Sequence, residues 1–162
     1  MNNSRQLCQA QTLVDLLQQR AAEQPDQRAY TFLLDGETEA VHLTYAELDR
    51  QARAIGTWLQ QMEATGERVL LLYLPGLEFI VAFFGCLYAG AVAVPVYPPR
   101  LKRSMPRIEA IVVDAQAKIA LTTTETITKL EPRLKQVPAL QALSCFATDQ
   151  SLPAPTDHRP EF

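Results

Sequence analysis

The feature that most constrains the fold is an almost uncharged stretch, residues 69–96, in which Glu78 carries the single formal charge. A membrane-spanning helix needs only about 20 apolar residues, so length alone would permit one. However, Pro75-Gly76 and Gly90 divide the stretch into pieces of strand, helix and strand length. Neither strand-like piece alternates polar with apolar side chains, which is typical of parallel strands covered on both faces. We therefore expect a buried βαβ unit with a right-handed crossover rather than a transmembrane segment.

Upstream of this unit the sequence predicts a helix followed by a β-hairpin. The Thr12 hydroxyl can cap the backbone amides of a helical turn that contains Asp15, and Pro25 ends that helix. Apolar residues then alternate along residues 30–43. Asp35-Gly36 lies in the middle and is a strong signal for a two-residue hairpin turn.

A capping box opens the next predicted helix. In Thr44-Tyr45-Ala46-Glu47 the Thr side chain can accept a hydrogen bond from the backbone amide of Glu47, while the Glu47 carboxylate reaches back to the amide of Thr44. Gly66 marks the expected end of this helix. The apolar residues that follow the box are spaced to share one helical face: Leu48, Ala52, Ile55, Leu59 and Met62.

Another strand and helix follow the βαβ unit. The spacing of apolar residues predicts a helix over 104–115, and residues 118–121 form a short apolar strand. Thr122-Thr123-Thr124-Glu125 offers a second capping box for a helix that runs to about Lys135, and residues 143–147 suggest a last strand. The fold class expected is therefore α/β, with a partial, parallel, doubly wound sheet, flanking helices and an N-terminal β-hairpin.

Composition excludes some function classes. A chain of 162 residues can hold one domain, and 48% hydrophobic with 20% charged residues is ordinary globular composition. The formal net charge of −3 gives no electrostatic case for a nucleic-acid partner.

The cysteines and the N-terminus indicate the compartment. Cys8, Cys86 and Cys145 are far apart, and none has the spacing of a metal-ligand cluster. The polar residues 1–6 are not followed by the apolar run of a secretory signal. A cytoplasmic location is expected.

Two segments together carry a family resemblance. Leu43-Thr44-Tyr45-Ala46-Glu47-Leu48 and, further on, Ala89-Gly90-Ala91-Val92-Ala93-Val94-Pro95 resemble early signature segments of the acyl-adenylate-forming ligases. Val94-Pro95-Val96-Tyr97-Pro98-Pro99-Arg100 and Arg107-Ile108-Glu109-Ala110-Ile111 resemble the fatty acyl-AMP ligase branch more than acyl-CoA synthetases or amino-acid adenylation domains. The resemblance covers residues 12–149.

The resemblance implies an enzyme that activates a fatty acid with ATP and Mg²⁺ and passes the acyl group to an acyl carrier protein, in polyketide, lipopeptide or lipid biosynthesis. Such chemistry needs a Gly-rich phosphate loop, a Mg²⁺-binding acid and a catalytic lysine, and no Gly occurs after Gly90. No catalytic, cofactor-binding or metal-binding residue is therefore assigned to this chain. The expected organisation is a disordered N-terminus at 1–11, an incomplete adenylation subdomain at 12–148 and a linker at 149–162 toward the remaining ligase domain.

Some features keep two interpretations. Pro75-Gly76 could offer backbone amides to an anion but is more typical of a structural turn. A basic run could meet an acidic carrier protein or belong to a solvated loop: Arg100, Lys102, Arg103 and Arg107. The remaining aromatic residues and histidines are expected to have packing or surface roles: Tyr45, Trp58, Tyr88, Tyr97, His42 and His158.

Two rivals to the acyl-AMP ligase interpretation stay open. One is a fragment of a long-chain acyl-CoA ligase, and the other is a stand-alone, non-catalytic interaction domain. In the favoured interpretation the isolated chain is inactive.

Overall fold

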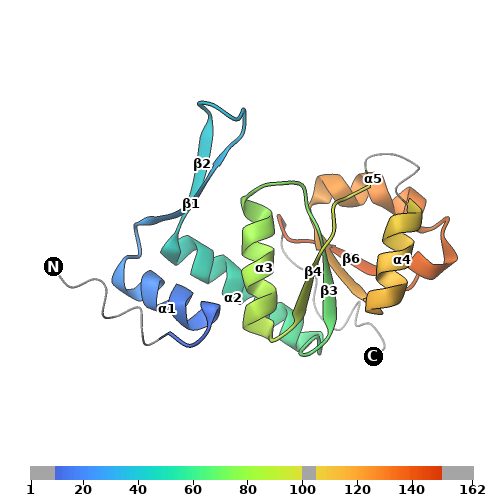
Figure 1. The fold of residues 1–162 in the computed structure, drawn as a ribbon, viewed down its shortest axis with the longest axis horizontal. Coiled ribbons are helices and arrows are strands. Elements are labelled where there is room, and N and C mark those ends of the chain that lie inside the picture. Colours follow the sequence, from blue (N-terminus) through green and yellow to red (C-terminus); the bar gives the residue numbers. More distant parts are fainter. Residues whose placement is uncertain (1–9, 100–104, 151–162) are drawn as a thin grey trace.

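A computed structural model describes residues 10–99 and 105–150, and Figure 1 shows how its elements are arranged. Most of the residues expected to be disordered or a linker, and position 104 of the predicted fourth helix, lie outside the described residues. In chain order the elements are α1 (Leu13–Glu23), β1 (Arg28–Leu33), β2 (Ala40–Thr44), α2 (Tyr45–Gln61), β3 (Arg68–Leu72), α3 (Leu77–Ala89), β4 (Val92–Pro95), α4 (Met105–Ala115), β5 (Ile119–Thr122), α5 (Thr124–Leu134), the 3₁₀ turn η3 (Pro138–Leu140) and β6 (Ser144–Ala147).

The main sheet is parallel, as predicted. Its strand order is β4-β3-β5-β6, so β3 lies between β4 and β5. The expected cover on both faces is wrong for β4, which is an edge strand with Val92 and Pro95 exposed. Every residue of β5, and every residue of β3 after Arg68, is buried. Such strands need cover on both faces, which explains why their sequence is apolar without alternation.

Helices cover the two faces of this sheet separately (Figure 1). Val69 and Leu71 of β3 belong to one apolar cluster, with side chains from α1, α2 and α3. Leu70 and Leu72 belong to a second cluster, with side chains from α4, α5 and η3. The sheet is therefore doubly wound, and the predicted fold class is confirmed.

The capping box predicted at Thr44 is present, and the predicted Thr12 cap is a capping box as well. Asp15 donates its backbone amide to Thr12 Oγ1 at 3.0 Å, and Glu47 donates its own to Thr44 Oγ1 at 3.2 Å. In both helices the acidic side chain accepts in return from the capping residue's amide. The predicted end of α2 at Gly66 is wrong, because the helix ends at Gln61 and Gly66 adopts its φ of 79° in the turn before β3.

The hairpin is antiparallel, as predicted, but its turn is longer than the two residues expected from Asp35-Gly36. Leu34 donates its amide to the Glu39 carbonyl at 2.7 Å, so a four-residue loop separates this pair. The Asp35 carboxylate accepts from the Thr38 hydroxyl and from the backbone amides of residues 37–39. These bonds stabilise the charged carboxylate and hold the pKa of Asp35 far below its usual range.

The hairpin projects away from the sheet and its covering helices (Figure 1). Leu43, at its base, is the one buried residue of the two strands. In the described part of the chain, no helix is both long enough and apolar enough to cross a bilayer.

Trp58 illustrates how α2 is joined to the sheet. Its indole is buried and meets the Phe146 ring of β6 edge to face, with 4.7 Å between centroids. Tyr45 and Tyr88 also pack against this cluster, so the expected packing roles of these aromatic residues are confirmed. His42 is exposed on β2, whereas His158 lies outside the described residues.

Candidate functional site at the carboxyl edge of the sheet

The order of the strands creates a switch point. From β3 the chain passes through α3 to β4 on one side, and then through α4 to β5 on the other side of β3. In open α/β sheets ligands bind outside the carboxyl ends of the strands at such a point. The ends of β3 and β5 are therefore where a site is expected.

Hydroxyl groups tie these strand ends together. Thr122 Oγ1 donates to the Leu72 carbonyl at 2.5 Å, and Thr148 Oγ1 donates to the Thr122 carbonyl at 3.3 Å. Thr148 has no second proton to give, so in its 2.7 Å bond with Tyr73 the phenol is the donor. Burial raises the pKa of Tyr73 well above its ordinary value, so the phenol stays protonated.

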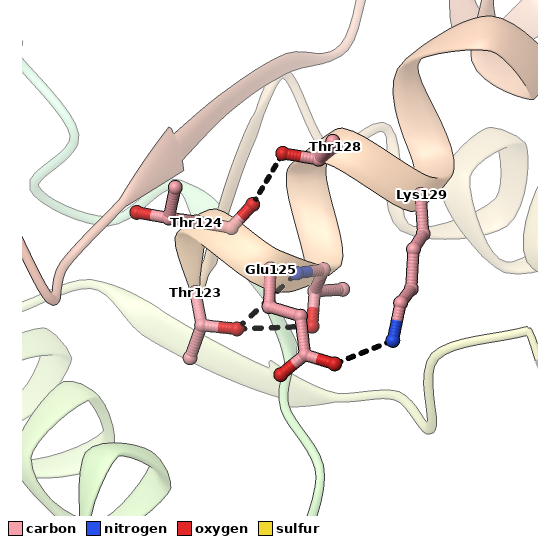
Figure 2. A network of polar contacts seen from close by, with 6 residues as sticks. Thr123, Thr124, Glu125, Thr128 and Lys129 are labelled. Atoms are coloured by element: carbon pink, nitrogen blue, oxygen red, sulfur yellow. Dashed lines mark hydrogen bonds and ion pairs between the residues drawn. The ribbon is translucent and has the colours of Figure 1, made fainter.

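The N-terminus of α5 follows directly, and here the predicted capping box is wrong by one residue. Thr122 lies in β5 and is fully buried, so the N-cap is Thr123, which accepts from the Thr126 amide (Figure 2). Glu125 does not reach back to a capping residue. It forms an ion pair with Lys129 along the helix surface.

Asp149 also binds at the N-terminus of α5. Its carboxylate accepts from the Thr124 amide at 2.9 Å and from the Thr124 hydroxyl at 2.9 Å. A carboxylate at a helix N-terminus is favoured by the helix dipole. Two of the amides that might have bound an anion, those of Thr124 and Thr126, are therefore already used by the chain itself.

The start of α3 is the position of Pro75-Gly76. Gly76 is the N-cap, and a Cβ built on it would lie 2.7 Å from Glu78 Oε2, which places this carboxylate over the first turn of the helix. The negative charge of Glu78 would repel an anion there. The contacts favour the structural interpretation of this turn.

A groove of about 460 Å³ lies at the carboxyl ends of β3 and β4. Arg107, exposed on α4, is the one charged residue in its lining, and Tyr97 is 43% exposed there rather than in the core. The other three residues of the predicted basic run lie outside the described residues. The lining is Leu71, Tyr73, Leu74, Pro75, Phe79, Pro95, Val96, Tyr97 and Arg107.

The described residues offer little reactive chemistry. Across 10–99 and 105–150, no three His, Cys, Asp or Glu side chains are placed together to hold a metal ion. Burial raises the pKa of Cys86 to about 12, and burial together with Glu131 raises that of Cys145 to about 12, so both thiols stay protonated. The carboxyl edge of the sheet can form one wall of a site, and the groove there suits apolar groups.

Sequence reasoning did not find the hydroxyl network. The sequence predicts Tyr73 only as part of an apolar strand and Thr122 only as the first residue of a helix cap. The available signal was the position of both residues at strand ends that a parallel sheet brings to one edge.

Comparisons with known proteins agree with this geometry. A profile of the family described as AMP-binding enzyme matches residues 17–160. A medium-chain-fatty-acid–[acyl-carrier-protein] ligase of Moorena producens is 57% identical over 114 residues, which are 68% of this chain and 19% of that protein. A long-chain-fatty-acid–AMP ligase of Mycobacterium tuberculosis is 31% identical over 142 residues, 86% of this chain and 24% of that protein.

A solved structure gives the same result. The fatty acyl-adenylate ligase from L. pneumophila, solved in complex with acyl adenylate and pyrophosphate, superimposes with a TM-score of 0.79 at 36% identity. The match covers 90% of this chain and 25% of that one. This chain thus spans a fifth to a quarter of the proteins that it resembles. Since the family profile extends over most of its length, the chain belongs to the family of AMP-binding enzymes.

Proposed function

We propose that this chain is the opening part of a cytoplasmic enzyme that activates a fatty acid with ATP and passes it to an acyl carrier protein. In this proposal residues 12–148 are an incomplete adenylation subdomain, and 149–162 lead toward the remaining ligase domain. The observation that carries the proposal is the 57% identity, over 114 residues, to a fatty-acid ligase whose acceptor is an acyl carrier protein.

The proposed reaction has two steps. A carboxylate oxygen of the fatty acid attacks the α-phosphorus of ATP, a new P–O bond forms, and pyrophosphate leaves. The thiol of the carrier, losing its proton, then attacks the carbonyl carbon of the acyl-AMP, and AMP leaves. Splitting the reaction in this way replaces one difficult acyl transfer with two easier steps.

The described residues supply structure to this reaction, and we assign them no direct part in it. The carboxylates at the helix starts, Asp149 and Glu78, would oppose a phosphate, and no three His, Cys, Asp or Glu side chains among the described residues are grouped to hold a metal ion. ATP and Mg²⁺ are therefore proposed to bind downstream residues. What this chain provides is the hydroxyl-bonded edge of the sheet against which such a site can be built.

A product assay tests the proposal. This chain and a version extended through the native downstream sequence are each given a fatty acid, ATP, Mg²⁺ and an acyl carrier protein, with CoA as the competing acceptor. We expect acyl-AMP and acyl carrier from the extended version alone. Activity in the 162-residue chain would contradict the assignment of the catalytic groups to downstream residues.

The other outcomes separate the rivals. Transfer to CoA in preference to the carrier would make the parent an acyl-CoA ligase. If the extended version forms neither acyl-AMP nor a thioester, the interaction-domain interpretation replaces the proposal.

A further inference from the structure

The two faces of the hairpin differ in character. In the register Tyr30↔Leu43 and Phe32↔Val41, the paired residues lie on one apolar face, which continues to Leu34 opposite Glu39. Residues of the opposite face are mixed: Thr31, Leu33, Ala40 and His42. A hairpin of two strands is marginal in water unless such a face is covered.

The cover is incomplete. At the base Leu43 is 8% exposed, but toward the tip Val41 is 38% and Leu34 is 53% exposed. Tyr30, which pairs with Leu43 on the same face, is also 39% exposed, so much of the apolar face is open, in agreement with the projecting hairpin in Figure 1. Side chains of this size on adjacent positions form a patch rather than isolated surface residues.

A groove of about 370 Å³ lies between this face and the start of α3. The hairpin contributes Phe32, Leu34, Val41 and Leu43, and the other wall includes Pro75 and Leu77. Glu78 is the one charged residue in the lining. A segment that enters this groove would therefore need apolar side chains.

We propose that the groove docks an apolar segment of the downstream part of the same polypeptide. The occupant follows from length, because the chain covers 25% of the ligase structure that it matches and about three quarters of such a protein remains to be placed. The tip of the hairpin is already held rigid by the Asp35 carboxylate, so docking orders few further residues. The inference rests on the proposed function in taking the parent to be a longer ligase.

Amide hydrogen exchange tests the inference directly. Exchange of residues 30–43 is compared between the 162-residue chain, at a concentration where sedimentation shows a monomer, and the version extended through the native downstream sequence. We expect exchange at least about tenfold slower in the extended version, because docking must then be broken before the amides open. Equal exchange in the two forms would overturn the proposal.

Two neighbouring residues provide a matched pair of variants. Val41→Lys places a charge on the groove face, and His42→Lys places one on the opposite face of the same strand. In the extended protein V41K should abolish the tenfold slowing, whereas H42K should keep it. Equal effects of the two variants would argue against a docking site on the groove face.

Other occupants would give different results. If the 162-residue chain shows slow exchange at a higher concentration, where sedimentation shows a dimer, and V41K abolishes both the slowing and the dimer, the occupant is a second copy. Slow exchange produced by added decanoate would identify a ligand. Either result would overturn the inference. The acyl-AMP assay is independent of these readings. Slow exchange without acyl-AMP would contradict the proposed function and support the docking site. Acyl-AMP without slow exchange would support the proposed function and contradict the docking site.

Discussion

Adjacent threonines have different tasks at the end of β5. Thr122 is a strand residue whose hydroxyl bonds to the Leu72 carbonyl in the neighbouring strand, inside the protein. Thr123, the next residue, has left the strand and caps α5. One residue of register thus separates a hydroxyl that joins two strands from one that begins a helix.

Substitutions at this junction should separate the true cap from the one that the sequence suggests. Thr123→Ala should lower the free energy of unfolding by about 1 kcal/mol, because the Thr126 amide loses its acceptor. Glu125→Gln should change it by no more than about 0.5 kcal/mol, because Glu125 and Lys129 are exposed and weakly coupled. Urea denaturation gives both values. A larger loss for E125Q than for T123A would restore the capping box at Thr122.

The local pattern around Thr122 shows why sequence alone chose the wrong cap. Thr122-Thr123-Thr124-Glu125 fits the capping-box spacing when Thr122 is the first residue, and the box at Thr44 was predicted correctly on the same grounds. What moves the cap is the pairing of Thr122 with Leu72 and Ala147. Those partners are distant in sequence, so a four-residue pattern contains no sign of them.

At the scale of elements, α2 and α3 pack closely against each other. A Cβ on Gly85 would lie 2.6 Å from Ile55 Cγ2, and one on Gly56 would lie 2.6 Å from the Cβ of Tyr88. Each glycine therefore accepts a side chain of the opposite helix. The pair is locked at its edge by Asp49, which binds the Tyr88 hydroxyl and the Arg53 guanidinium.

Gly85→Ala tests this contact. Alanine favours the helix by about 1 kcal/mol over glycine, but overpacking costs about 1–3 kcal/mol, so we expect a net loss of about 1 kcal/mol. The matched control is the same change in an Ile55→Ala background, where Cγ2 is absent but Cβ still lies 2.8 Å from the new methyl group, so the loss should become smaller without disappearing. Equal effects in both backgrounds, measured by thermal denaturation, would show that the helices separate without cost.

Elements were easier to predict than the turns between them. The helix face of residues 48–62 and the unalternating apolar stretch that forms β3 are repeated signals, in which each position supports the next. The hairpin turn depended on Asp35-Gly36 alone, and the Asp35 carboxylate widened it by binding three amides. A side chain that replaces backbone partners is difficult to foresee from a dipeptide.

At the scale of the whole molecule, one aromatic contact joins the N-terminal helices to the far edge of the sheet. Trp58 comes from α2, and Phe146 comes from β6. Both lie in the apolar cluster that also contains Leu17 of α1. The described elements of this face should therefore unfold together.

Trp58 is the chain's one tryptophan, so its fluorescence can test this cooperativity. Urea transitions followed by fluorescence and by far-UV circular dichroism should have the same midpoint. Phe146→Ala should shift both midpoints equally, with a loss of about 3 kcal/mol, whereas Val113→Ala at a 59% exposed position should shift neither by more than about 0.5 kcal/mol. A fluorescence midpoint at lower urea would mean that α2 separates from the sheet before the sheet unfolds.

The order of the strands in the sheet could not be predicted from the sequence. Near-continuous apolar strands predicted a parallel sheet, but nothing in β5 says which side of β3 it joins. The side depends on which face α4 covers, and this is settled by packing against Leu70 and Leu72. A local sequence pattern cannot indicate which face α4 covers, since both faces of β3 are equally apolar.

The central place of β3 has a consequence for a chain that is still being made on the ribosome. Both of its partners come later in the sequence, β4 from Val92 and β5 from Ile119. Until residue 92 has been added, the nascent chain has no strand to set beside β3. At that stage α2 and α3 can cover one face of β3. The other face stays uncovered until α4 has been synthesised. The two faces of β3 are therefore covered at different times during synthesis. A pause between these times would leave the second face exposed to chaperones.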